Sequence, residues 1–237
     1  MSRPLRDAAG RLALRGEAVQ CPMCSSTFAR FGRFNGRPNA RCHRCGGLER
    51  HRLLWLYLEQ NTDLFTRPQR VLHIAPEVHL QQRLRSVHGT GYVYGDIADP
   101  HHRIDVTAIA HPDDSFDVAI CSHVLEHVPD DEKAVRELAR VLTRTGWAIL
   151  DAPVDEGRAE TYCDPSISSP TERRTHFGQW DHVRVYGRDY TALLQRGGFE
   201  VEMATVGLDE VDARRHGLRP TKDRIYLCRL TSEDPKG

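Results

Sequence analysis

The sequence predicts an α/β fold, in which a mostly parallel sheet carries helices on both faces and a small metal-binding module precedes it. Short apolar segments alternate with helical segments from about residue 70 onwards, which is typical of a parallel sheet covered on both sides. Four cysteines in two closely spaced pairs come before this alternation. The chain has 237 residues, enough for one substantial domain and a small additional module.

The cysteine pairs predict a zinc ribbon over residues 19–47, after an N-terminal extension over residues 1–18. Two C-x2-C pairs are separated by seventeen residues, a spacing typical of a zinc site with four thiolate ligands. Four ligands leave no open position on the metal, so a structural role is expected. A module of this size cannot bury enough core to fold without the metal. The alternative is a set of unrelated buried cysteines. The expected ligands are Cys21, Cys24, Cys42 and Cys45.

Composition and charge limit the classes of protein that the chain can represent. It is 39% hydrophobic and 28% charged, without an apolar run that suits a membrane span or a secretory signal. A cytoplasmic location without a membrane partner is expected. The other three cysteines are expected to be buried core thiols: Cys121, Cys163 and Cys228. Residues 1–60 carry eleven arginines against four acids, so this basic end attracts either an anionic partner or the acidic remainder of the chain.

Between the cysteine pairs, phenylalanines alternate with arginines in the segment FARFGRFNGRP. Such interleaving suits a platform for single-stranded nucleic acid, because bases stack on aromatic rings while arginines neutralise phosphates. The favoured alternative is a short hairpin whose phenylalanines form the core of the ribbon and whose arginines are solvated. RNA is therefore the second choice of partner, after a small molecule.

The remaining elements follow in order along the chain. A connecting helix is predicted within residues 48–67, where GLERHRLLWLYLEQN places leucines and Tyr57 at helical spacing. The last two strands follow one another without a helix, which predicts an antiparallel hairpin at an edge of the sheet. Only the final residues, SEDPKG, suggest a frayed tail. Strands are expected at residues 70–75, 91–96, 103–107, 116–122, 147–153, 199–206 and 223–230, and helices at 77–87, 131–142 and 187–198.

The segment DVTAIAHPDDSFDVAICSHVLEHVPDDEKAVRELARVLTRTGWAIL resembles the central block of class I S-adenosylmethionine-dependent methyltransferases of the type 11-like group. The resemblance implies a seven-stranded, mostly parallel Rossmann-like sheet, in a domain expected over residues 68–232. The cysteine ribbon followed by CGGLERHRLLWLYL is similar to a subgroup in which a zinc ribbon precedes this domain.

The resemblance also implies which residues bind S-adenosylmethionine. VLHIAPE occupies the position of the family's first motif, where other residues replace its spaced glycines. Glu77 either reaches the ammonium group of the cofactor or caps the following helix. Asp96 is expected to bind the ribose hydroxyls and Asp105 the adenine, although each is also a common turn residue. The expected cofactor-binding residues are His73, Ala75, Glu77, Asp96, Asp105, Val106, Ser122 and His123.

Two polar clusters are expected where methyl transfer occurs. The first runs from Ser122 to His127 after the fourth strand, although its LEH segment is also a scaffold feature of the family. The second is HFGQWDHVRVYG, residues 176–187, in which a histidine oriented by an acid would act as a base. The expected catalytic residues are His182, Asp181 and His127.

The predicted function is the transfer of a methyl group from S-adenosylmethionine to an oxygen or nitrogen atom of a small or medium-sized acceptor, with S-adenosylhomocysteine as product. RNA methylation, with the basic ribbon binding RNA, is one alternative. The other is a non-catalytic domain that binds S-adenosylmethionine or a partner protein. This last alternative supposes that catalysis was lost with the first motif's glycines.

Overall fold

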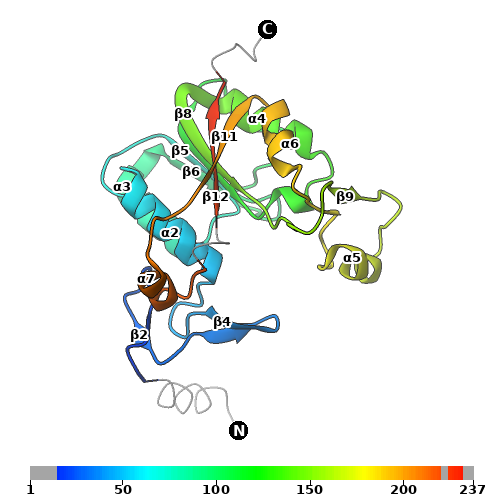
Figure 1. The fold of residues 1–237 in the computed structure, drawn as a ribbon. Helices are drawn as coiled ribbons and strands as arrows, with labels where there is room; N and C mark the ends of the chain where they lie inside the picture. The colour runs from blue at the N-terminus through cyan, green and yellow to red at the C-terminus, as the bar shows by residue number, and fades with distance from the viewer. Residues whose placement is uncertain (1–14, 220–223, 232–237) are drawn as a thin grey trace. The chain divides into compact units, whose positions relative to one another are not determined.

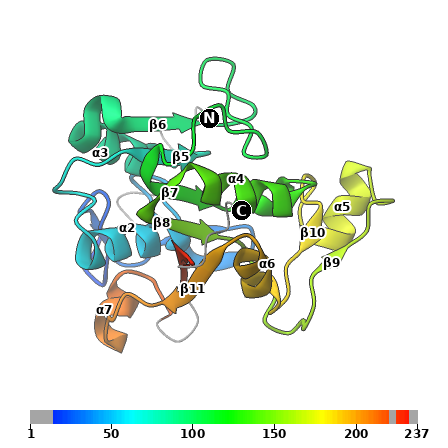
Figure 2. The same cartoon turned by 90° about the horizontal axis from the view of Figure 1, so that it is seen from above.

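The computed structural model describes residues 15–219 and 224–231, which divide into two compact units (Figures 1 and 2). Of these residues, the first unit contains 15–66, 77–83, 204–219 and 224–225, and the second contains the rest. Most of the predicted N-terminal extension and the predicted C-terminal tail lie outside the described residues. No helix in the described part of the chain is long and apolar enough to cross a membrane.

The first unit contains the cysteine ribbon, which is built from two antiparallel strand pairs. Asn35 and Gly36 form the turn of the second pair with φ angles of 46° and 78°, a conformation that Asn-Gly tolerates at low cost. Helix α2 (Glu49–Asn61) follows the ribbon, as predicted, and helix α7 (Glu210–Arg215) belongs to the same unit. The ribbon strands are β1 (Val19–Gln20), β2 (Thr27–Phe28), β3 (Gly32–Phe34) and β4 (Arg37–Arg41).

A buried arginine of α2 links the parts of the first unit. The guanidinium group of Arg52 donates hydrogen bonds to the carbonyls of Ala40 and Gly47 in the ribbon, at 2.9 and 3.2 Å. It also donates to the carbonyl of His216 at 2.7 Å and lies 3.9 Å from the ring centroid of Phe31. These contacts compensate the desolvation of a fully buried charge.

Two of the three ribbon phenylalanines, Phe31 and Phe28, belong to its own core as the sequence favoured, whereas the partly buried Phe34 does not. Phe31 is buried at 2% exposure together with Val19, Cys21 and Cys42, and Phe28 packs against this cluster. A ring enclosed in this way is not available to stack on a base. The ribbon therefore lacks at Phe31 the aromatic platform that single-stranded RNA would need.

The main sheet is mostly parallel and has flanking helices, as predicted. Strands β6, β5, β7 and β8 pair in parallel, and β12 is antiparallel to β8. Helices α4 (Asp131–Val141) and α6 (Tyr190–Arg196) place their apolar residues in the same buried cluster as Leu72 and Ile74 of β5. The strand order is β11 (Phe199–Ala204), β12 (Ile225–Leu230), β8 (Leu142–Asp151), β7 (Phe116–Ser122), β5 (Val71–Ile74) and β6 (Tyr92–Gly95). Helix α3 (Val78–His88) and the short helix η1 (Gly89–Gly91) lie between β5 and β6 in sequence.

The prediction of seven strands is wrong, because the described main sheet has six and residues 103–107 form no strand. Asp105 supplies the reason: its Oδ1 accepts hydrogen bonds from the backbone N–H and the hydroxyl of Thr107, at 2.8 and 2.7 Å. Such a side-chain bond turns the backbone away from an extended conformation. The backbone of Asp96 bonds to His102 and Ile104, which is too short a ladder for a strand.

The predicted C-terminal hairpin is wrong in its connection. Helix α7 separates β11 from β12 in sequence, because Asp209 accepts hydrogen bonds from two N–H groups of its first turn. β12 lies between β11 and β8, so β11 forms the edge of the sheet.

Cys121 and Cys228 are buried as predicted, but Cys163 is exposed. The prediction for Cys163 fails because this residue belongs to β9 (Tyr162–Cys163), a two-residue strand that pairs with β10 (Arg184–Val185) outside the main sheet. Helix α5 (Pro170–Phe177), which was not predicted, follows β9 and begins with a capping box at Ser169 and Glu172.

Candidate functional site

A cavity of about 570 Å³ lies at the carboxyl ends of the parallel strands in the second unit. Its wall includes Ala75 after β5, Asp96 after β6 and His123 after β7. This end of an open α/β sheet is where such folds bind their ligands, and the volume is typical of a small-molecule site. The cavity is therefore the candidate site of the protein.

Two residues in the cavity wall adopt a left-handed backbone conformation that L-residues rarely adopt. Ala75 has a φ of 48° and His123 a φ of 57°. Their N–H groups donate to the carbonyls of Gly95 and Asp151, both at 2.7 Å. Backbone strain of this kind gathers at functional sites. Ala75 thus keeps a glycine-like conformation without a glycine, but its N–H group is bonded within the sheet.

The two aspartates predicted to bind the cofactor line the cavity with Val106. Asp96 Oδ1 accepts from the N–H of Ala98 at 2.7 Å, which orients the carboxylate. Hydrogen bonds from the hydroxyl and N–H of Thr107 hold the pKa of Asp105 below its usual value. Both groups are therefore fixed acceptors that suit the hydroxyl or amino donors of a ligand.

Three other predicted cofactor residues are not among those that line this cavity. His73 is fully buried in β5, and its Nδ1 lies 2.9 Å from the hydroxyl of Tyr92. Ser122 ends β7 in register with Asp151. Glu77 belongs to the other compact unit. The binding roles of these residues stay predictions.

The structure brings together the two polar clusters that the sequence indicated separately. His127 Nδ1 lies 3.3 Å from Asp181 Oδ2, and the rings of His127 and His182 stand perpendicular with centroids 4.7 Å apart. Glu126 is buried, with its Oε1 3.5 Å from His123 Nδ1 and 3.9 Å from His127 Nε2. His123, His127 and Asp181 also line the cavity. We call these five residues the histidine cluster.

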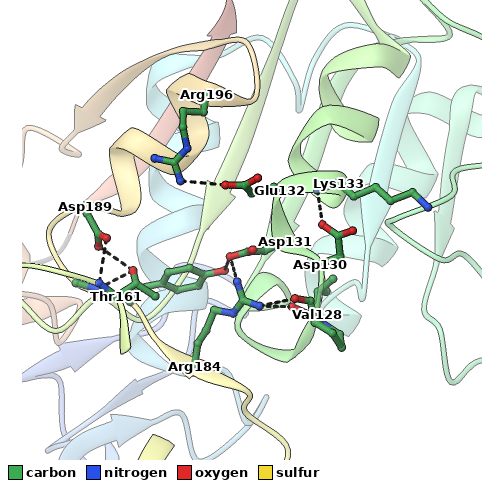
Figure 3. Close-up of polar contacts among 12 residues, drawn as sticks. Val128, Asp130, Asp131, Glu132, Lys133, Thr161, Arg184, Asp189 and Arg196 are labelled. Carbon is green, nitrogen blue, oxygen red and sulfur yellow. Dashed lines mark hydrogen bonds and ion pairs between the residues drawn. The ribbon is translucent and has the colours of Figure 1, made fainter. Parts of the chain in front are cut away.

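Hydrogen bonds between two distant segments hold the histidine cluster together, and Figure 3 shows those that Arg184 makes to the segment after the short helix η2 (Leu125–His127). The N–H of Val183 donates to the carbonyl of Glu126, in η2, at 2.9 Å. The buried Arg184 donates to two carbonyls directly after η2, at 2.9 and 2.7 Å, and forms an ion pair with Asp131. Asp181 and His182 are positioned against His127 because they directly precede these anchored residues.

The burial of His182 affects its charge. Burial lowers the pKa of His182 below its usual value, and the attraction of Glu126 opposes this effect. A lowered pKa favours the neutral imidazole at physiological pH, which has one nitrogen lone pair available.

Most of the apolar wall of the cavity was not predicted from the sequence. Ile97, which is 50% exposed, Val124 and Val128 line the cavity beside the predicted polar residues. Ile97 directly follows Asp96, a predicted cofactor residue just after β6, and this position was a signal that could have identified it. A half-exposed isoleucine in a concave wall suits the apolar face of a ligand.

The sulfur atoms of the four ribbon cysteines all lie within 4.8 Å of one another. The Sγ atoms of Cys21 and Cys45 are 3.6 Å apart, and those of Cys24 and Cys42 are 3.7 Å apart. Zinc–sulfur bonds of about 2.3 Å in a tetrahedron place the sulfurs about 3.8 Å apart. Both pairs share one backbone hydrogen bond, in which the N–H group of Cys21 or Cys42 donates to the carbonyl five residues later. This donor set fits zinc.

Comparisons with known proteins support a methyltransferase domain. Residues 78–150 match the family described as "Methyltransferase domain". Over 73 residues, or 31% of the chain, the sequence is 46% identical to the uncharacterised methyltransferase YcgJ of Bacillus subtilis (strain 168). The match spans only 26% of that relative's length.

Two similar solved structures were also found, one of which is described as a methyltransferase. The 1,6-didemethyltoxoflavin-N1-methyltransferase of Burkholderia thailandensis, with bound 1,6-didemethyltoxoflavin and S-adenosylhomocysteine, is 14% identical with a TM-score of 0.48 over 76% of each chain. The structure of YcgJ is 22% identical with a TM-score of 0.44, over 63% of this chain and 70% of that one. Residues 78–150 are therefore similar to the methyltransferase domain family, and this similarity covers less than half of the chain.

Proposed function

We propose that the protein transfers a methyl group from S-adenosylmethionine to an oxygen or nitrogen atom of a small or medium-sized acceptor. The single observation that carries this proposal is the composition of the cavity wall. One part of the wall offers Asp96 and Asp105, and another offers His127 and Asp181. A nucleoside cofactor and an acceptor could therefore meet within one space, as methyl transfer requires.

The aspartate part of the wall is the proposed cofactor end. Asp96 would bind the ribose hydroxyls and Asp105 the adenine amino group, while Val106 and Ile97 would contact the apolar faces of the adenine ring. When bound, S-adenosylmethionine supplies a methyl group on a sulfonium. The carboxylates bind and orient the nucleoside, because each is already fixed by hydrogen bonds within the chain.

The histidine cluster is the proposed acceptor end, with His127, Asp181 and His182 as the catalytic group. A hydroxyl or amine acceptor must lose a proton when it gains a methyl group. Asp181 orients the imidazole of His127 through the 3.3 Å contact to its Nδ1. The cluster therefore offers oriented imidazole nitrogens that can receive or polarise the acceptor's proton.

We also propose a structural zinc ion at Cys21, Cys24, Cys42 and Cys45. RNA is not part of the proposal, because Phe31 is buried in the ribbon core and the arginine Arg52 covers its ring. A binding measurement distinguishes the non-catalytic alternative from this proposal. An intact protein that binds neither S-adenosylmethionine nor S-adenosylhomocysteine would support a partner-binding role.

Replacing Asp96 by alanine is expected to weaken S-adenosylmethionine binding by about 1–3 kcal/mol, the effect of losing a hydrogen bond to a charged group. Isothermal titration calorimetry measures this change. Asp164→Ala is a matched control, because Asp164 holds an equivalent turn through the N–H of Ser166 and does not line the cavity. An unchanged affinity in Asp96→Ala would exclude this residue from the cofactor site.

A further inference from the structure

Glu126 is the residue of the histidine cluster that methyl transfer alone leaves unexplained. Its side chain is only 2% exposed, and its Oε2 is buried without a hydrogen bond in the described part of the chain. A buried carboxylate in this position is costly unless a positive charge or hydrogen-bond donors compensate it. Its Oε1 lies 3.5 and 3.9 Å from ring nitrogens of His123 and His127.

The surrounding geometry suits a metal ion. One ligand atom each from Glu126, His127 and His182 lies within 4.8 Å of the others. Three ligands with metal bonds of about 2.1 Å lie roughly 3–3.5 Å apart, so small side-chain rotations would complete the site. Two imidazoles and one carboxylate are a donor set that zinc, manganese, iron and cobalt accept.

The contacts behind His127 are also those of a metal ligand. A metal-binding histidine usually directs its second ring nitrogen to a carboxylate, which orients the ring. His127 directs Nδ1 to Asp181 Oδ2 at 3.3 Å, which leaves Nε2 on the side of Glu126. Gln179 in turn donates to Asp181 Oδ1 at 2.9 Å and fixes that carboxylate.

We propose that Glu126, His127 and His182 bind a divalent transition-metal ion at the wall of the cavity. Three protein ligands leave a position open. Because His127 lines the cavity, an acceptor bound there can reach the metal. This site is distinct from the four-cysteine site, which lies in the other compact unit.

The consequence for the acceptor rests on the proposed methyltransferase function. An acceptor with an ionisable hydroxyl would bind the open position, where a metal ion favours the deprotonated oxygen. The hydroxyl proton leaves to solvent water. A lone pair of that oxygen then forms the new bond to the methyl carbon, while the electrons of the sulfur–carbon bond stay on sulfur as the sulfonium becomes a neutral thioether. In this form His182 holds the metal and does not itself take the proton.

Titration with Mn²⁺ tests the proposed site, because manganese prefers nitrogen and oxygen ligands to thiolates. The full-length, zinc-loaded protein is titrated, and free Mn²⁺ is followed by electron paramagnetic resonance. One Mn²⁺ per chain is expected to bind. Glu126→Gln and His182→Ala should each weaken binding at least about tenfold, and Asp181→Asn about 10- to 100-fold. His176→Ala is the control, since His176 is an exposed histidine outside the cluster.

Wild-type protein that binds no more Mn²⁺ than Glu126→Gln would overturn the metal site, as would equal loss of binding in His176→Ala. S-adenosylhomocysteine affinity is measured in each variant to show that the fold is intact. If Glu126→Gln fails to fold, His182→Ala and Asp181→Asn give the same comparison. Mn²⁺ binding without any S-adenosylhomocysteine binding would overturn the proposed function and leave the metal site supported.

Discussion

Replacing Cys42 by serine is expected to abolish zinc binding and unfold the ribbon, while the main sheet stays folded. A structural zinc ion contributes about 10–16 kcal/mol in small zinc-finger peptides, which exceeds what a module of this size gains from its core. Apart from two of the cysteines, the buried hydrophobic residues described in the ribbon are few, namely Val19, Phe31 and Ala40. The sheet has its own buried cluster and is expected to survive.

The loss of zinc should also destabilise residues outside the ribbon. Arg52 donates to the carbonyls of Ala40 and Gly47, so unfolding the ribbon leaves this buried guanidinium without those acceptors. An uncompensated buried charge is strongly destabilising. Residues 204–219, whose His216 carbonyl also accepts from Arg52, are therefore expected to become sensitive to proteolysis.

Elemental analysis and limited proteolysis measure these two effects. Wild-type protein should contain about one zinc per chain, in agreement with one closed site of four thiolates. Cys163→Ser is the matched control, because Cys163 is an exposed cysteine outside the cluster and its loss should change neither measurement. Less than half an equivalent of zinc in wild-type protein, after expression with ample metal, would count against the site.

Replacing His182 by alanine is expected to lower saturated turnover by about 10²–10⁴, with almost no change in cofactor affinity. The reason is that His182 supplies one of the imidazole nitrogens at the acceptor end, whether it acts on the proton directly or through the metal. Asp96 and Asp105, which would hold the cofactor, remain in place.

The measurement is the release of S-adenosylhomocysteine with an acceptor identified by screening hydroxyl and amine compounds. His176→Ala serves again as the control and should keep wild-type turnover. If His182 only shapes the acceptor pocket, KM should rise while saturated turnover changes little. Unchanged kcat and KM would remove His182 from the proposed site.

The sequence predicted the two segments of the candidate site but not that their side chains contact one another. The motif after β7 indicated His127, and the density of polar and aromatic residues in 176–187 indicated Asp181 and His182. Their contacts depend on the N–H of Val183 and on Arg184, which anchor one segment to the other. A contact between residues more than fifty positions apart arises from tertiary packing, so no local sequence pattern predicts it.

Local signals by themselves determined the parts of the fold whose physics is local. The paired cysteine spacing defines a cluster because each C-x2-C knuckle forms within a few residues, and the helical and strand periodicities of α2, β5 and β7 report burial along one element. Tertiary structure alone decided the rest. Residues 103–107 have the pattern of a strand, yet the Asp105–Thr107 bond turns them. The sequence placed Glu126 in a polar cluster, but its burial beside His123 and His127 is known only from the fold. In both cases the outcome depends on hydrogen bonds and neighbours that sequence spacing does not specify.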